Sequence, residues 1–201
     1  MRWLGPLLLA MVALAPAPAR AGERISLNGL GIALTAPDGW QRISAEEAVA
    51  HLPDIRVGSA EYRREVSRIP RPIIALRKAP PAQYAGPVPI LNVLFSELVV
   101  DRTPMQVLER TVRVSRRALG DVQILQAPHR VRVSGLPAAH MRVAYSVEQR
   151  GIRVRGISEY WVVVRGGYYF AFSSGYGPDE PAATRAAILA AIESVRLDPA
   201  S

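Results

Sequence analysis

The sequence contains no cysteine, and all but one of its 25 basic residues are arginine, Lys78 being the exception. The absence of cysteine excludes disulfides, a lipid-modified N-terminal cysteine and any thiolate metal or redox site. An exported chain without disulfides is held together by its hydrophobic core. The preference for arginine supplies planar guanidinium groups, which suit carboxylates and phosphates.

Known signatures of catalysis and cofactor binding are missing as well. The sequence has no Gly-x-Ser-x-Gly motif, no Walker loop and no dinucleotide fingerprint. Its three histidines, His51, His129 and His140, form no pair with each other or with a carboxylate at ligand spacing. We therefore predict no catalytic residue, no metal ligand and no cofactor. A hydrolase with an unrecognised site, using His129 or Ser174, is the alternative.

The first 21 residues have the pattern of an export signal. Arg2 supplies positive charge, residues 3–14 are apolar, and Ala19-Arg20-Ala21 matches the small-x-small cleavage pattern. The apolar segment is short for a membrane span. We expect cleavage near Ala21 and a single mature domain, residues 22–201, in the periplasm or outside the cell without a transmembrane anchor. An uncleaved anchor is the alternative.

The N-terminal half predicts short strands and short helices. Ser44 and Glu47 form a capping box, which begins a helix that ends near Leu52. Segment 79–89 contains four prolines and is expected to be a stiff connector, although partner binding there stays open. The other predicted elements are strands over 24–28, 31–35, 72–77 and 90–99, the last buried on both faces, and a helix over 59–69.

The C-terminal half predicts an amphipathic helix, several antiparallel strands and a closing helix. Thr103, Pro104 and Gln106 begin the first helix, and Gly120 ends it. From Val122 onward the apolar period changes from 3.6 to 2, which is typical of strands. The predicted features are strands over 122–126, 129–134, 139–149, 152–165 and 168–174, a break at 135–137, a bulge at Gly156, a tight turn at Gly166-Gly167 and a helix capped by Asp179.

Together these elements predict an α+β domain, a curved antiparallel β-sheet with helices packed on it. Their order resembles that of PsbP-like proteins, and the segments that carry the resemblance are 32–40, 135–142, 160–172 and 187–197. The first contains the Pro-x-Gly-Trp element, and the last is a closing helix. The resemblance covers about residues 23–197 and implies an α/β/α sandwich of the PsbP/Mog type. It also implies an accessory or binding protein, without any functional residue that matches this sequence.

Arginines on neighbouring predicted strands are the main candidate binding residues: Arg130, Arg132, Arg142, Arg153 and Arg155. If they share one face, that face suits an acidic protein, an anionic lipid surface or an anionic polymer. The alternative is a solvated face on which Glu148 and Glu159 are interspersed. Tyr169 and Tyr176 are further candidates, because the alternation of the last strand gives them no obvious core position.

We therefore expect an exported, non-enzymatic binding or accessory protein of the bacterial cell envelope, which acts through protein–protein contacts with an envelope partner. A module that binds an anionic ligand or anionic envelope surface is the alternative. No nucleic-acid partner is expected, because the chain has no basic arm and export separates it from nucleic acid.

Overall fold

The computed structural model describes residues 22–50, 55–56, 70–78, 84, 87–98, 102–119, 121–149 and 151–198. The strands are β1 (Arg24–Leu27), β2 (Ile32–Thr35), β3 (Trp40–Arg42), β4 (Ile55–Arg56), β5 (Ile74–Lys78), β6 (Ile90–Glu97), β7 (Val122–Val133), β8 (Leu136–Gln149), β9 (Ile152–Arg165), β10 (Tyr168–Tyr176) and β11 (Arg196–Leu197). The helices are the 3₁₀ turn η1 (Asn28–Leu30), α1 (Ala45–Val49), α3 (Pro104–Leu119) and α4 (Ala182–Glu193).

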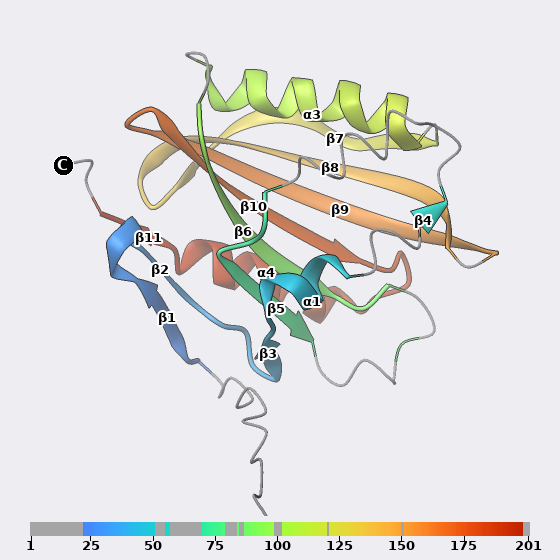
Figure 1. Cartoon of the computed structure of the whole chain (residues 1–201), viewed down its shortest axis with the longest axis horizontal. Coiled ribbons are helices and arrows are strands. Elements are labelled where there is room, and N and C mark those ends of the chain that lie inside the picture. The colour runs from blue at the N-terminus through green and yellow to red at the C-terminus, as the bar shows by residue number, and fades with distance from the viewer. Residues whose placement is uncertain are drawn as a thin grey trace, which may run out of the picture.

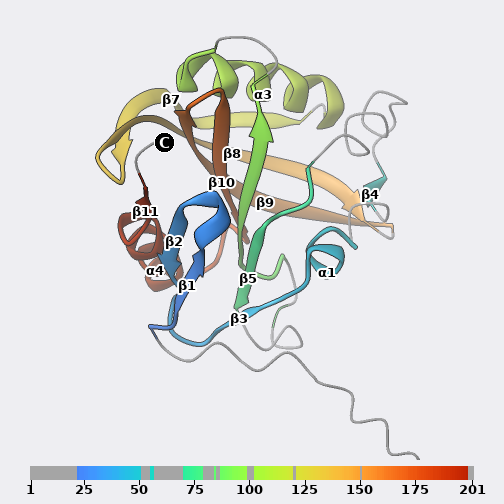
Figure 2. The same cartoon turned by 60° about the vertical axis from the view of Figure 1, so that its left-hand side comes forward.

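The strands form two antiparallel sheets. The larger has eight strands in the order β3-β5-β6-β10-β9-β8-β4, and β7 also pairs with β8. The smaller has the order β1-β2-β11. Helix α3 lies across one face of the large sheet, whereas α4 and the small sheet cover the other face (Figures 1 and 2). The predicted α+β class, a curved sheet with helices packed on it, is confirmed.

Both faces of the large sheet carry an apolar core. Beneath α3, Leu108 and Val112 pack against the sheet residues Ala139, Met141, Val162 and Ala171. On the other face a larger cluster joins all three layers: α4, the small sheet and the large sheet. Its members include Ile188 and Ile192 of α4, Ile32 and Leu34 of β2, and Trp161, Phe170 and Phe172 of the large sheet.

The predicted capping boxes begin two of the helices. In α1 the Ser44 hydroxyl accepts the Glu47 backbone N–H at 3.0 Å. At the start of α3 the Thr103 hydroxyl accepts the Gln106 backbone N–H at 3.3 Å, and the Gln106 side chain accepts the Thr103 N–H at 2.9 Å. These bonds satisfy amide groups that have no partner in the first helical turn. Helix α1 ends at Val49, earlier than predicted.

The predicted cap of the last helix is wrong. Asp179 lies in an exposed turn, and α4 begins after Pro181, which makes no side-chain cap bond. Instead, the Thr184 hydroxyl donates to Glu180 at 2.6 Å. The ammonium of Lys78 on β5 donates to Glu180 at 2.8 Å and to Thr184 at 2.7 Å. The first turn of α4 is thus fixed to β5 by tertiary contacts that local sequence does not reveal.

The chain between Val122 and Gln149 is more continuous than predicted. β7 is one strand in which the pairing with β8 is irregular between Ile124 and His129. The predicted break at 135–137 is a tight turn, because Ser134 and Gly135 both have positive φ, 53° and 75°. Such a turn reverses the chain at once, so β8 begins directly at Leu136.

Gly156 does not mark a bulge. The pairing of β8 with β9 is unbroken from Ala138–Val163 to Gln149–Ile152. Gly156 lies opposite Tyr145, and a Cβ atom at this position would lie 2.5 Å from the tip of the Tyr145 ring. The glycine therefore makes room for an aromatic ring. The predicted turn at Gly166-Gly167 is confirmed, with φ values of 57° and 80°.

Several predictions fall outside the described residues: the export signal over 1–21, the helix over 59–69, His51 and most of the Pro-rich segment. Strand β6 ends at Glu97 and is less buried than expected, since Leu91 and Val93 are fully buried but Leu94 only half-buried. Within the described ranges no helix is both long and apolar enough to cross a membrane.

Candidate functional site

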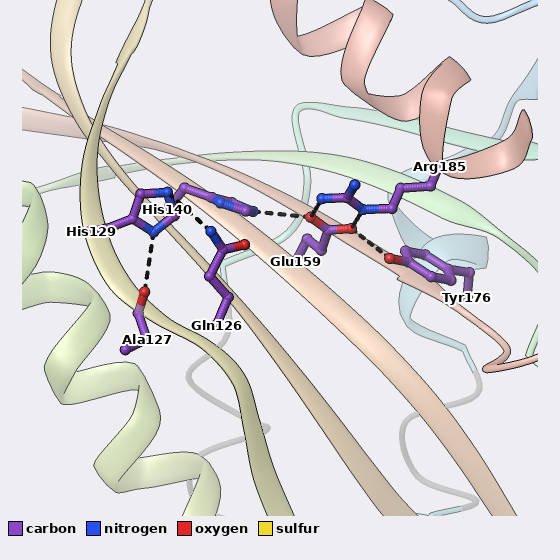
Figure 3. Close-up of polar contacts among 7 residues, drawn as sticks. All are labelled: Gln126, Ala127, His129, His140, Glu159, Tyr176 and Arg185. Atoms are coloured by element: carbon purple, nitrogen blue, oxygen red, sulfur yellow. Dashed lines mark hydrogen bonds and ion pairs between the residues drawn. The ribbon is translucent and has the colours of Figure 1, made fainter. Parts of the chain in front are cut away.

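A buried charged cluster lies where the start of α4 packs on the large sheet (Figure 3). Its centre is Glu159 of β9, whose side chain is 0% exposed. Glu159 alternates with Trp161 and Val163, so it projects from the face of β9 that forms the core beneath α4. We call Glu159 and the three side chains that bind it, His140, Tyr176 and Arg185, the Glu159 cluster.

Four hydrogen bonds reach the Glu159 carboxylate. The Tyr176 hydroxyl and Arg185 Nε donate to Oε1 at 2.5 and 2.7 Å. Arg185 Nη2 and His140 Nε2 donate to Oε2 at 3.1 and 3.0 Å. A carboxylate offers about four acceptor positions, so both oxygens of Glu159 are fully used.

The contacts set the charge of the cluster. Burial alone would raise the pKa of Glu159, but hydrogen bonds from His140, Arg185 and Tyr176 outweigh it and lower that pKa to about 2. Burial and the bond to Glu159 raise the pKa of Tyr176 well above its usual value. The bond to Glu159 also raises the pKa of Arg185. At neutral pH Glu159 is therefore an anion, and the Tyr176 hydroxyl and the Arg185 guanidinium beside it keep their protons.

Aromatic contacts orient His140 toward Glu159. The imidazole stacks on the Trp161 ring, with centroids 4.5 Å apart and planes 20° apart. His129 of β7 meets it edge-on at 5.1 Å. The His129 ring in turn contacts the carbonyl of Ala127 at 3.1 Å and the amide of Gln126 at 3.4 Å. The row of rings leaves His140 Nε2 directed at the carboxylate (Figure 3).

The cluster leaves little access for a reacting molecule. Glu159 is fully buried and His140 is nearly so, whereas Arg185, 35% exposed, reaches solvent. Ser174, the candidate nucleophile of the hydrolase alternative, is buried, and its hydroxyl has no hydrogen-bond partner among the described residues. In those residues no group of three or more histidines and carboxylates is placed to hold a metal ion.

The candidate arginines do not share one face of the sheet. Cross-strand partners point to the same face. Arg130 pairs with Ala139, which lies beneath α3, and Arg132 follows two residues later. Arg142 pairs with Glu159 on the opposite face. Two arginines therefore lie on the α3 face and one on the α4 face.

The remaining two arginines lie on the same face of the sheet as Glu159. Arg153 and Arg155 alternate with Glu159 along β9, so their side chains point to the α4 face of the sheet. Both residues lie near the start of β9. Arg153 forms an exposed ion pair with Asp121, with 2.7 Å between Nη2 and Oδ2. The single basic face that the sequence suggested is thus divided between two sides of the molecule.

Neither candidate tyrosine has the surface position expected for it. Strand β10 continues to Tyr176, so this residue follows the alternation of Phe170 and Phe172 into the core. Its hydroxyl ends at Glu159. Tyr169 points the other way and packs, half-buried, against the apolar cluster beneath α3.

Sequence reasoning placed Glu159 on a solvated face and found no carboxylate partner for His140. A local signal existed, since Glu159 shares the alternation of Trp161 and Val163, which are large apolar residues. A carboxylate at such a position requires buried partners. Those partners come from β8, β10 and α4, and only the tertiary structure brings them together.

No protein-family model and no curated protein matches the chain. Solved structures do match it. LpqN, involved in cell envelope biogenesis of Mycobacterium tuberculosis, has a TM-score of 0.54 and 18% identity over 84% of this chain and 83% of that chain. The cyanobacterial PsbP protein CyanoP from Synechocystis has a TM-score of 0.54 and 16% identity over 94% and 99% of the two chains.

A third match is a Pseudomonas aeruginosa protein of unknown function, PA94, described as a putative regulator. Its TM-score is 0.51, with 12% identity over 90% of this chain and 99% of that chain. Identities this low establish the fold and nothing further. The chain has the PsbP-like fold, as the order of its sequence elements predicted.

Proposed function

We propose that the protein is an exported accessory protein of the bacterial cell envelope that acts through protein–protein contacts. The observation that carries the proposal is the saturated state of Glu159. Its two oxygens accept four hydrogen bonds inside the core, which leaves neither oxygen for water or a substrate. The Glu159 cluster therefore serves to hold α4 on the sheet, and the outward function belongs to the surface.

The envelope assignment draws on two further supports. The first 21 residues have the pattern of an export signal. LpqN, which has the same fold, is described as involved in cell envelope biogenesis, and none of the three similar structures is described as an enzyme.

Exposed apolar side chains offer contact points for a partner. Ile152 lies beside the β8–β9 turn and is 68% exposed. Tyr168, at the β9–β10 turn, is 39% exposed and stacks on Phe95 with ring centroids 5.1 Å apart. A large exposed aliphatic residue and a supported tyrosine suit a protein interface, because burial of both removes apolar area from water.

Site-specific photo-crosslinking in living cells tests the proposal. A photoreactive residue replaces Ile152 in one variant and Tyr168 in another, and the exposed Ala186 of α4 serves as the matched control position. We expect a discrete crosslinked product at Ile152 or Tyr168, identified by mass spectrometry, and none at Ala186. Recovery of the free monomer alone from both test positions would count against an envelope partner.

The hydrolase alternative has its own test. A panel of ester, peptide and glycoside substrates is expected to give no turnover with the purified protein. Turnover that disappears in Ser174→Ala or His129→Ala, while the variant remains folded by circular dichroism, would replace the accessory role with an enzymatic one.

A further inference from the structure

The outer side of α3 carries a one-sided arginine stripe. Among the α3 side chains that the structure describes, six are exposed: Gln106, Glu109, Arg110, Arg113, Arg116 and Arg117. Four of these six are arginines and one is a glutamate. The buried side of the same helix is apolar, so packing on the sheet explains Leu108 and Val112 but not the arginines.

Repulsion within the stripe is only partly compensated. Glu109 lies four residues before Arg113, an attractive spacing, whereas Arg110, Arg116 and Arg117 have no carboxylate at helical spacing on α3. Arg113 lies three residues from Arg110 and four from Arg117, spacings at which like charges on a helix repel each other. Among the described residues, none of the four arginines forms an ion pair. Exposed arginines elsewhere do pair, as Arg71 does with Glu46 at 2.6 Å. The favourable effect of Arg116 and Arg117 on the helix dipole accounts for only the last turn.

Two strand arginines extend the stripe sideways. Arg130 and Arg132 of β7 are exposed and leave the sheet on the face that α3 covers. Arg132 donates to the carbonyl of Gly135 at 2.7 Å, which supports its side chain without neutralising its charge. The α3 stripe and these two residues together form what we call the α3 basic face: Arg110, Arg113, Arg116, Arg117, Arg130 and Arg132.

We propose that the α3 basic face rests on a membrane surface that carries anionic phosphate headgroups. Guanidinium groups bind phosphate oxygens in a bidentate manner, and a lipid surface offers many such groups in one plane. Of the large apolar side chains that are exposed in the described part of the chain, Leu125, Ile152 and Tyr168, none lies on α3. A protein partner would need such an anchor at the centre of its contact, whereas headgroups do not.

Vesicle co-sedimentation of the purified protein tests the inference. The vesicles contain phosphatidylcholine alone or a mixture with phosphatidylglycerol. We expect binding only to the mixture, with a steep loss when NaCl rises from about 0.05 M to about 0.5 M and screens the charges. In the double variant Arg113→Gln/Arg117→Gln the affinity should fall at least about tenfold.

A matched control removes the same charge elsewhere. Arg24 on β1 and Arg42 on β3 are exposed and lie on the side of the molecule away from α3 (Figures 1 and 2). The variant Arg24→Gln/Arg42→Gln should bind the mixed vesicles within about twofold of the original protein, because a surface contact is short-ranged in salt. Thermal unfolding of the α3 variant should change little, because relief of the repulsion between arginines offsets the lost attraction of Arg113 to Glu109 and of Arg117 to the helix dipole.

Three outcomes would overturn the inference. The first is an absence of binding to mixed vesicles at low salt. The second is an equal loss of binding in the α3 and control variants, which would indicate net charge alone. The third is capture by immobilised polyglutamate without vesicle binding, which would assign the face to an acidic protein. The assay contains no envelope protein. A negative result would therefore overturn the membrane inference and leave the proposed accessory role untouched.

Discussion

The two faces of the large sheet handle charge in opposite ways. On the α4 face an ionised carboxylate, Glu159, lies inside the core, and its two oxygens accept four hydrogen bonds. On the α3 face the core is apolar, and the charges stand outside on the helix surface. Hydrophobic contacts alone tolerate small shifts of a helix, whereas a saturated ionic cluster fixes α4 at one position. The apolar core beneath α3 uses none of the arginines of that helix, so they are free to face outward.

The largest expected effect comes from removal of the buried carboxylate. Glu159→Ala leaves Arg185, His140 and Tyr176 without their acceptor, and we expect a loss of about 4 kcal/mol in the free energy of unfolding. Urea denaturation measures it. Glu148→Ala, an exposed glutamate on β8, is the matched control and should change stability by less than about 0.5 kcal/mol.

A double variant separates the charge from the packing. Glu159→Leu/Arg185→Leu removes both charges, so it should be more stable than Glu159→Leu alone, because no buried charge is left unpaired. Equal stability of the two variants would mean that the ion pair does not hold α4.

The apolar core beneath α3 should lose stability when a buried side chain there is shortened. Leu108→Ala opens a cavity between α3 and the sheet, and we expect a loss of about 3 kcal/mol. Leu125→Ala is the control, because Leu125 is 38% exposed and should cost less than about 0.5 kcal/mol. The difference in unfolding free energy between the original protein and Leu108→Ala should be the same at pH 7 and pH 3. A difference that changes with pH would mean that the α3 core depends on charge.

Acid should weaken the α4 face selectively. The folded-state pKa of Glu159 is lowered from 4.5 to about 2, so its stabilisation is complete above pH 4.5 and is lost as pH falls toward 2. The shift corresponds to about 3 kcal/mol, which screening at the partly exposed Arg185 reduces to roughly 2 kcal/mol. The difference in unfolding free energy between the original protein and Glu159→Gln should shrink by this amount. A constant difference across this pH range contradicts the prediction.

The smallest expected effects come from single arginine substitutions on the two faces of the sheet. Arg132→Gln removes charge from the α3 basic face and should weaken binding to anionic vesicles about fivefold. Arg155→Gln removes equal charge from the opposite face, where Arg155 is exposed, and should leave binding unchanged within about twofold. Both should alter unfolding free energy by less than about 0.5 kcal/mol. Equal weakening by both variants would indicate that the protein binds through overall charge.

Much of the architecture follows from local patterns. The cap residues Ser44 and Thr103, the change of period near Val122 and the turn at Gly166-Gly167 each act over a few residues, so sequence reveals them. The errors lie where a distant side chain intervenes. Gly156 looked like a bulge because its reason, the ring of Tyr145, belongs to another strand. Asp179 looked like a cap because Lys78, which fixes the start of α4, is about one hundred residues away.

The candidate site was less predictable than the fold. Tyr176 lost its apparent surface role because β10 runs two residues further than the pattern indicated. The basic face contains other arginines than the sequence suggested. Strand pairing decides which side chains of each strand point toward α3 and which toward α4. Such registers depend on the whole sheet, and a shift of one residue exchanges the two faces.

The sequence by itself determined the PsbP-like order of strands and helices, the amphipathic character of α3 and the absence of thiol chemistry. Tertiary structure alone decided that Glu159 is a buried anion, that His140 has a carboxylate partner and that the strand arginines are divided between two faces. The physical reason is range. Propensity, capping and periodicity act between near neighbours, whereas desolvation and ion pairing depend on groups that folding brings together from four separate elements.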